Sequence, residues 1–480
     1  MKRISFEHLF AFLSLMVPSA IVGFAQTPGL APPDRAAIEH LDKDIPKYMG
    51  LARVPGASAA LIRDGKLVWL KSLGVTNGDT RQPVTDQTIF EANSLSKPVF
   101  ALAVLTLVDQ GRVNLDAPVI DYDGTDFKGC NDPRFNKITT RMILSHSSGI
   151  IEDEKSPCKI GLAFNPGERF QYSPAGFDVL SDVVEKISGM KIEDFIKNAV
   201  LAPLAMNDSS YVWRPAYDDL RAYRHDWAGQ VVPDRRKWTH GAACCSLQTN
   251  ARDYAKYVVA TLNGSLIKKS TREEMLKPQI AVSPKLPDLH WGLGWGLETT
   301  DKGESIWHWG DSGQSRNYVA VNLAQKNAVI LFTNSENGLS FLREILDDGI
   351  GGNHQAPLFL DYERYDSPTW KLLSDVLKKG AAPALADYHK QKLKDKDGIS
   401  ETSMNQLGYR LLSIKKTSDA ITVLRQNAED FPQSGNAWDS LAEACMDNGD
   451  TAAAIKYYQK SLDINPKNDN AKKMMEKLRH

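Results

Sequence analysis

The chain has little net charge, few cysteines and no second long apolar run. Its 480 residues carry 58 Lys and Arg against 59 Asp and Glu, a formal net charge of −1. This balance gives no reason to expect a nucleic acid or an anionic membrane surface as a partner. No apolar segment beyond the N-terminus has the roughly 20 residues needed to cross a bilayer. His-Glu-x-x-His, phosphate-loop and zinc-type Cys/His patterns are missing, so we expect neither a metal nor a cofactor.

The five cysteines leave their redox state open. Cys130 and Cys158 flank one segment and form a candidate disulfide if the chain enters an oxidising compartment. Cys244 and Cys245 are adjacent, and Cys445 lies far from both pairs. Free, buried thiols are an equally good interpretation of all five.

The first residues have the pattern of a signal peptide, which we assign to residues 1–25. Lys2 and Arg3 give a positive start, residues 9–22 are apolar but are interrupted by Pro18, and small residues precede Gln26. The pattern predicts export with cleavage before Gln26 rather than an uncleaved anchor. We therefore expect an exported protein, in a bacterial periplasm or secreted, without a transmembrane segment in the mature chain.

Residues 26–352 have the pattern of one α+β domain. Strand patterns occur at both ends of this region, whereas its middle consists of short helices and loops. An antiparallel sheet flanked by helices, with a mostly helical subdomain, is the architecture that this order predicts. Strands are expected at residues 59–62, 67–70, 292–297, 318–322 and 328–332, and helices at residues 35–51, 99–108 and 339–348.

The pattern becomes all helical after Gly352. Residues 353–400 form a linker with helices, and residues 401–480 contain a repeat with a period of 34 residues. The repeat pairs Trp438, Leu441, Ala442, Ala454, Tyr458 and Pro466 with Met404, Leu407, Gly408, Ala420, Leu424 and Pro432. These positions resemble the tetratricopeptide repeat, in which paired helices stack small residues against large ones. Such repeats imply a concave groove for a peptide or protein partner.

One Ser-x-x-Lys pair stands out from the five in the chain. Ser94 and Lys97 directly precede Pro98 and a long apolar run. Proline is tolerated only near the start of a helix, so Ser94 is expected at a helix N-terminus, with Lys97 one turn away on the same face. Helix N-termini favour developing negative charge, and a buried lysine can assist a serine nucleophile. The alternative is a helix N-cap followed by an ordinary surface lysine.

The motifs that follow Ser94 resemble, in their order, those of the serine β-lactamase-like hydrolases. This family includes class C β-lactamases, D-alanyl-D-alanine carboxypeptidases, D-aminopeptidases and esterases, and the resemblance covers about residues 32–352. It rests on the Ser94-x-x-Lys97 motif, Leu144-Ser145-His146-Ser147-Ser148-Gly149, Asn165-Pro166-Gly167, Tyr172-Ser173 and His308-Trp309-Gly310. The resemblance implies that Ser94 is the acylated nucleophile and Lys97 its proton partner. It also implies that Tyr172 moves protons on and off the nucleophile and leaving group.

The third motif implies a substrate-binding strand edge. Gly310 would let the substrate backbone approach closely, and the N–H groups of Ser94 and Asp311 would form an oxyanion hole. Trp309 is either an aromatic wall of the site or an ordinary packing residue. His146 does not match a charge-relay role in this family, and we expect it to satisfy backbone groups in a structural turn.

Two departures from the family pattern bear on the substrate. Pro174 stands where the second motif commonly has asparagine, and His308 where the third commonly has lysine. Near neutral pH a histidine is mostly uncharged, so it binds a substrate carboxylate less well than lysine does. We therefore expect an exported esterase or D-aminopeptidase-like hydrolase that cleaves a small-molecule or peptide ester or amide. A β-lactamase or D,D-carboxypeptidase is one alternative, and a catalytically weak scaffold that binds partners through its repeats is the other.

Overall fold

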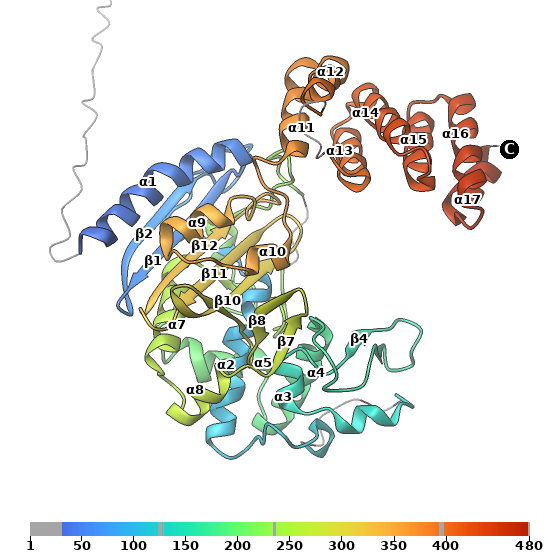
Figure 1. Ribbon diagram of the computed structural model, residues 1–480. Helices are drawn as coiled ribbons and strands as arrows, with labels where there is room; N and C mark the ends of the chain where they lie inside the picture. The colour runs from blue at the N-terminus through green and yellow to red at the C-terminus, as the bar shows by residue number, and fades with distance from the viewer. Residues whose placement is uncertain (1–30, 123–126, 128, 234–236, 393–397, 479–480) are drawn as a thin grey trace, which may run out of the picture.

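The computed structural model describes residues 31–122, 127, 129–233, 237–392 and 398–478 (Figure 1). The predicted signal peptide, residues 1–25, lies outside the described residues. Across the described ranges, no helix combines the length and apolar character needed to span a membrane. A sheet domain with a helical subdomain is followed by an arm of paired helices that ends at the C-terminus (Figure 1).

An eight-stranded antiparallel sheet forms the centre of the larger domain, with the strand order β2-β1-β12-β11-β10-β9-β8-β7. The first two strands of the chain lie beside its last, as Ala59 of β1 faces both Lys71 of β2 and Leu331 of β12. This confirms the prediction that the N- and C-terminal strands of the domain lie in one sheet. Its strands are β1 Gly56–Arg63, β2 Lys66–Gly74, β7 Ile280–Ser283, β8 Leu286–Trp291, β9 Gly296–Thr300, β10 Gly303–Asp311, β11 Arg316–Asn322 and β12 Asn327–Thr333.

Two sequence predictions within this sheet are wrong in detail. Of the strand expected at residues 292–297, only Gly296 and Leu297 belong to one, β9; residues 292–295 form the turn between β8 and β9, where Gly294 adopts φ +86°, a left-handed conformation that interrupts a strand. The strands expected from pattern do not include β10, which carries the His308 motif, although the family resemblance implied a strand edge there. The error arose because the Trp-rich run of β10 shows no regular alternation of apolar and polar residues.

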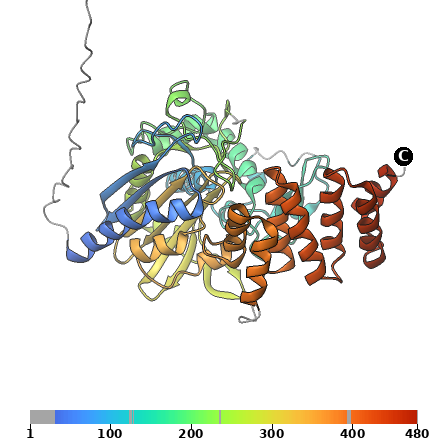
Figure 2. The same cartoon turned by 90° about the horizontal axis from the view of Figure 1, so that it is seen from above.

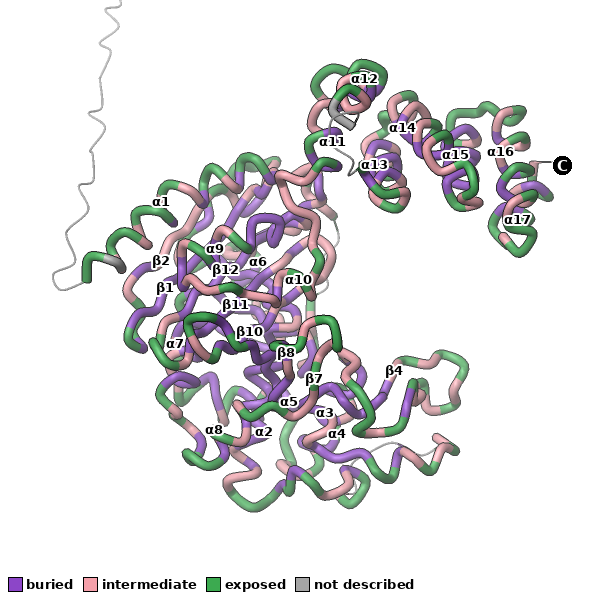
Figure 3. The backbone as a smooth tube through the Cα atoms, in the orientation of Figure 1, coloured by how far each residue is buried: buried purple, intermediate pink, exposed green. Residues whose placement is uncertain are grey.

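Helices cover both faces of the sheet. On one face α1 (Pro32–Ala52) and α9 (Leu342–Gly349) pack on β1 and β12. On the other face α7 (Ala251–Asn263) packs on β1 and β12, and α2 (Ser96–Asp109) belongs to the same buried cluster. Alternate residues of β1 supply the two cores, Ala59 and Leu61 to the first and Ala60 and Ile62 to the second. Figure 3 shows α2 as a buried element. The predicted α+β domain with flanking helices is confirmed.

The helical subdomain lies beside α2. Its elements are α3 Thr140–Leu144, β4 Ile150–Glu152, β5 Ile160–Leu162, α4 Pro174–Ser188, α5 Ile192–Ile196, α6 Tyr217–Leu220 and α8 Lys269–Met275. A disulfide joins Cys130 to Cys158 with a Cα–Cα distance of 5.4 Å, while Cys244, Cys245 and Cys445 are reduced. The pair that the spacing suggested is therefore the one that forms.

The C-terminal arm is a stack of antiparallel helix pairs (Figure 2). It comprises α11 Pro368–Lys379, α12 Ala381–Lys392, α13 Glu401–Ser413, α14 Thr417–Asp430, α15 Gly435–Asp447, α16 Thr451–Ile464 and α17 Asp469–Leu478, and the short helix α10 Ala356–Leu360 precedes it. Gly408 of α13 lies so close to α14 that an added Cβ would be 2.4 Å from Leu424. The small-against-large pairing expected from the 34-residue repeat is thus present in the packing.

Candidate active site

Ser94 lies at the start of α2, in a turn of 3₁₀-helix formed by Asn93–Leu95. Pro98 falls in the first turn of α2, where its missing N–H costs no helical hydrogen bond. Asn93 adopts φ +53°, and its side-chain amide donates to the Ser315 carbonyl at 3.0 Å. This bond ties the segment carrying Ser94 to the turn that follows β10, so the first and third motifs meet.

Lys97 is fully buried and faces Ser94. Its Nζ donates to Ser94 Oγ at 2.9 Å and to the Cys244 carbonyl at 2.7 Å, and it lies 4.8 Å from the ring centre of Tyr172. The burial and contacts of Lys97 exclude the alternative interpretation that it is an ordinary surface lysine. The Cys244 carbonyl supplies an oxygen acceptor to Lys97 in a site where Pro174 has no amide to offer. Sequence reasoning missed this acceptor because every residue has a backbone carbonyl, so no residue type marks it.

Tyr172 completes the cluster from the loop that precedes α4. Burial raises the pKa of Tyr172, although contact with the Lys97 ammonium opposes the shift. Burial works against the charge on Lys97, but its contacts with Tyr172 and Cys244 outweigh this effect and raise the pKa of Lys97. Near neutral pH the two groups therefore hold both protons, as a tyrosine hydroxyl and an ammonium, and they titrate as a pair.

His308 is fully buried on β10. Its Nδ1–H donates to the Trp309 carbonyl at 2.7 Å, and its Nε2 has no hydrogen-bond partner among the described residues. Burial and the nearby Lys97 lower the pKa of His308 to about 3. The ring is thus neutral throughout the physiological range, as expected for a histidine that replaces a lysine here.

Gly310 packs directly on the segment that carries Ser94. A Cβ added to Gly310 would lie 2.1 Å from the Ala92 carbonyl oxygen and 3.3 Å from Asn93 Cβ. The close approach at Gly310 is therefore made by the protein's own backbone, while approach of a substrate stays a prediction. This contact brings β10, whose last residue is Asp311, against the segment that carries Ser94, while the oxyanion hole stays a prediction.

Trp309 and His146 enclose Tyr172. The Trp309 ring lies 4.6 Å from that of Tyr172, and the His146 ring lies 4.3 Å from it. His146 adopts φ +55° and its Nδ1 accepts the Ser173 N–H at 3.0 Å. It therefore satisfies a backbone group, in agreement with a structural turn rather than a charge relay. Burial lowers the pKa of His146 well below its usual value.

Comparisons with known proteins match two parts of the chain. A family model described as "Beta-lactamase" matches residues 41–347, and one described as "Tetratricopeptide repeat" matches residues 435–468. The chain is 23% identical over 320 residues to "Protein flp" of Staphylococcus aureus (strain N315), which covers 62% of this chain and 63% of that protein. It is 29% identical over 188 residues to "Esterase EstB" of Burkholderia gladioli, covering 33% of this chain and 48% of the esterase.

A solved structure has the same fold. The octameric penicillin-binding protein homologue from Pyrococcus abyssi superposes with a TM-score of 0.57 at 26% identity, covering 71% of this chain and 81% of that one. Because the match to "Protein flp" spans less than two thirds of that protein's length, the relatives' activities do not carry over to the whole chain.

Proposed function

The chain belongs to the beta-lactamase family, and from that premise we propose that it is a serine hydrolase that cleaves an ester or an amide through an acyl-enzyme on Ser94. The contact of 2.9 Å between Lys97 Nζ and Ser94 Oγ carries the proposal. A fully buried lysine is costly unless it is used or paired, and this one is directed at a serine hydroxyl at a helix N-terminus.

The proposed reaction assigns one task to each residue. Ser94 Oγ attacks the substrate carbonyl carbon while the Lys97–Tyr172 pair takes the hydroxyl proton. The N–H groups of Ser94 and Asp311 hold the oxyanion, and Tyr172 returns a proton to the leaving oxygen or nitrogen. Water then attacks the acyl-enzyme with the same pair as its base, which restores the Ser94 hydroxyl and releases the acid.

An ester or an amide without a carboxylate next to the reacting bond suits the site best. His308 is neutral because the pKa of His308 is lowered to about 3, so β10 offers no fixed cation to a substrate carboxylate. Trp309 adds an aromatic wall against Tyr172, which favours an apolar acyl or leaving group. The similarity to an esterase over 188 residues supports ester cleavage as the activity to test first.

One set of assays tests this function. The full-length mature chain and Ser94→Ala are incubated with a fluorophosphonate probe, p-nitrophenyl acetate and butyrate, nitrocefin and D-alanine p-nitroanilide. Labelling and ester turnover that disappear in Ser94→Ala are the expected result. Nitrocefin as the dominant substrate would favour a β-lactamase, and the absence of both labelling and turnover would leave a scaffold that acts through its repeats.

We further propose that the protein is exported and begins at Gln26 once residues 1–25 are removed. The charged and apolar pattern of these residues supports export. The Cys130–Cys158 disulfide supports it independently, because disulfides persist mainly in oxidising compartments. Mass spectrometry of the protein recovered from the periplasm tests the cleavage site, and an intact Met1 there would contradict it.

A further inference from the structure

The active-site wall continues into a segment that follows the family domain. This segment, called here the connector, consists of α10 and residues 361–364, beyond the family match that ends at residue 347. Phe359 of the connector lies 6.2 Å from the Trp309 ring and 6.2 Å from the Phe170 ring. It thus packs against Trp309, whose ring also contacts that of Tyr172, and against Phe170, whose ring contacts that of His146.

Tyr362 of the connector bonds directly to the third motif. Its hydroxyl donates to Asp311 Oδ2 at 2.6 Å, and its ring lies under the Arg316 guanidinium at 4.4 Å. Arg316 donates to the same Asp311 oxygen at 3.2 Å, while Asp311 Oδ1 accepts the Gly313 N–H at 2.6 Å. The three hydrogen bonds hold the β10–β11 turn through the Asp311 carboxylate, and the ring contact holds Arg316 beside it.

The β10–β11 turn is therefore held from two sides. On one side Asn93, the neighbour of Ser94, donates a hydrogen bond to the Ser315 carbonyl. On the other side the Tyr362 hydroxyl donates one to the Asp311 carboxylate. Since the backbone N–H of Asp311 is half of the proposed oxyanion hole, the position of Asp311 decides how well that hole fits the transition state. Small displacements of such a donor cost large factors in rate.

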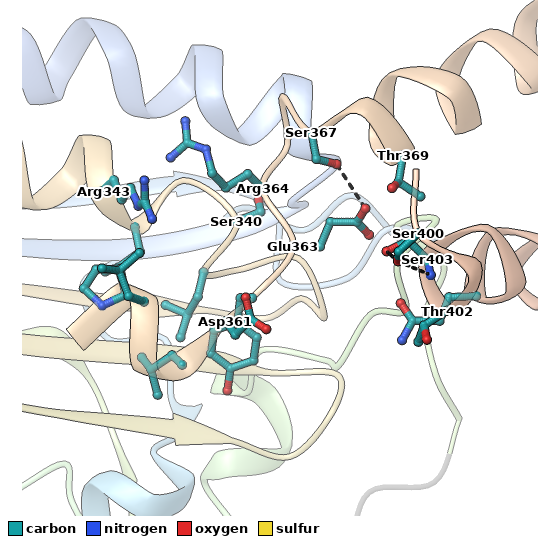
Figure 4. A pocket seen from close by; sticks show the side chains of 17 residues that line it. Ser340, Arg343, Asp361, Glu363, Arg364, Ser367, Thr369, Ser400, Thr402 and Ser403 are labelled. Atoms are coloured by element: carbon teal, nitrogen blue, oxygen red, sulfur yellow. Dashed lines mark hydrogen bonds between the residues drawn. The ribbon is translucent and has the colours of Figure 1, made fainter. Parts of the chain in front are cut away.

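The repeat domain holds the connector in turn. Glu363, next to Tyr362, accepts from Ser367 at 3.0 Å and pairs with Arg410 of α13 at 2.6 Å. Figure 4 shows Glu363 directed toward Ser367, with Ser400 and Ser403 at the start of α13 across a cleft of about 560 Å³.

Arg410 is itself fixed by both domains. Its guanidinium lies 5.9 Å from the ring of Trp227 and 5.7 Å from that of Trp370. Trp227 also donates to Ser413 of α13 at 3.2 Å. Trp227 of the larger domain and Leu407 of α13 share one buried hydrophobic cluster, so α13 is packed on the larger domain rather than tethered to it.

We propose that Tyr362 is a positioning residue of the active site, and that the Glu363–Arg410 ion pair lets the helical repeats hold it in place. The proposal rests on the hydrolase activity proposed above. It assigns to the repeat domain a part in catalysis within the same chain: the first repeat helix fixes the connector, the connector fixes Asp311, and Asp311 completes the oxyanion hole.

The test compares Tyr362→Phe, Arg410→Gln and their combination in the full chain. Tyr362→Phe is expected to lower kcat for p-nitrophenyl acetate and the rate of fluorophosphonate labelling by about tenfold, with KM within about twofold of wild type. Arg410→Gln is expected to lower kcat by about threefold. The double variant should be no slower than Tyr362→Phe alone, because the ion pair acts through Tyr362. Tyr365→Phe and Arg425→Gln, matched changes away from Asp311, should leave kcat unchanged.

Amide hydrogen exchange gives a second measurement that does not depend on turnover. Protection of residues 310–316 is expected to fall in Tyr362→Phe and in Arg410→Gln, and to stay unchanged in the two control variants. Wild-type kcat and protection in Tyr362→Phe would overturn the proposal. So would an Arg410→Gln defect that adds fully to that of Tyr362→Phe. If the wild type itself neither reacts nor turns over while protection falls as expected, the proposed hydrolase activity is wrong and the positioning contact stands.

Discussion

Gly310 of β10 and Ala92, two residues before Ser94, are in direct backbone contact. The contact leaves no room for a side chain, since a Cβ on Gly310 would lie 2.1 Å from the Ala92 carbonyl oxygen. It joins the strand that bears the third motif to the turn that bears the nucleophile. The distance between these two segments sets the distance between the N–H groups of Ser94 and Asp311, so this contact controls the proposed oxyanion hole.

We therefore expect Gly310→Ala to lower kcat by about 10²-fold or more, because loss of one oxyanion donor costs factors of this size. The clash should also cost about 1–3 kcal/mol of stability, as overpacking of a core does. Steady-state kinetics and thermal unfolding measure the two effects. Gly50→Ala in α1, where the added Cβ would meet nothing within 4 Å beyond the adjoining backbone of its own helix, is the control and should keep the wild-type kcat. An active Gly310→Ala would show that the two segments need not touch.

The pH dependence of turnover follows from the Lys97–Tyr172 pair. Both pKa values are raised, so near neutral pH most molecules hold both protons and only a small fraction has the base form that accepts the Ser94 proton. The base form grows as pH rises toward these pKa values and is lost as pH falls. We expect kcat/KM for an ester, corrected for spontaneous hydrolysis, to rise by up to about tenfold per pH unit between pH 7 and 9. A flat profile over this range would contradict the assignment.

Tyr172→Phe separates the two members of the pair. We expect kcat to fall by about 10²-fold or more, since a proton-transferring group is lost. Burial then acts on Lys97 without the opposing contact of Tyr172, so the pKa of Lys97 should fall and the rising limb of the profile should move to lower pH. A near-wild-type rate, or a limb that moves to higher pH, would remove Tyr172 from the proton transfer.

Local pattern sufficed to predict those parts of the fold that depend on neighbouring residues. Pro98 and the apolar run after it located the helix start at Ser94, and the strand patterns at residues 59–62 and 328–332 located the sheet. Contacts made by backbone atoms, or between segments far apart in the chain, have no signature in the order of residue types and could not be predicted. The Cys244 carbonyl on Lys97 and the Ala92 carbonyl against Gly310 are backbone groups, and Tyr362 reaches Asp311 across a gap of 51 residues.

His146 should prove structural and not catalytic. Its Nδ1 accepts the Ser173 N–H and its ring packs on Tyr172, so His146→Ala leaves a buried N–H without its acceptor. We expect a loss of about 2–4 kcal/mol in unfolding free energy, measured in urea, from the unmet hydrogen bond and the cavity. Turnover should fall less than in Ser94→Ala, and the pH profile should keep its shape. A rate as low as that of Ser94→Ala in a fully folded His146→Ala protein would instead support a charge relay.

The Cys130–Cys158 disulfide should contribute to stability and not to chemistry. It closes a loop with a sequence separation of 28, for which the chain-entropy estimate is about 3–4 kcal/mol. Replacing both cysteines with serine should lower the free energy of unfolding by up to this amount. The folded variant should keep its ester kcat, because neither cysteine contacts Ser94 or Lys97. A matched Cys445→Ser change in α15 reports on thiol loss without loss of a crosslink.

A lysine commonly occupies the position of His308 in this family. Restoring it by His308→Lys should not produce a β-lactamase. The side chain at this position is fully buried and lies close enough to Lys97 for that ammonium to lower the pKa of His308. A second ammonium there would be buried beside a like charge, which destabilises the fold and disfavours protonation of both lysines.

We expect His308→Lys to have a lower melting temperature, an ester kcat reduced by more than about tenfold, and no gain of nitrocefin turnover. His308→Gln keeps a neutral polar group, so its melting temperature and its ester kcat should fall less than those of His308→Lys. Efficient nitrocefin hydrolysis by His308→Lys would show that residue 308 alone sets the substrate class, and that the buried, neutral environment around it adapts to a charge.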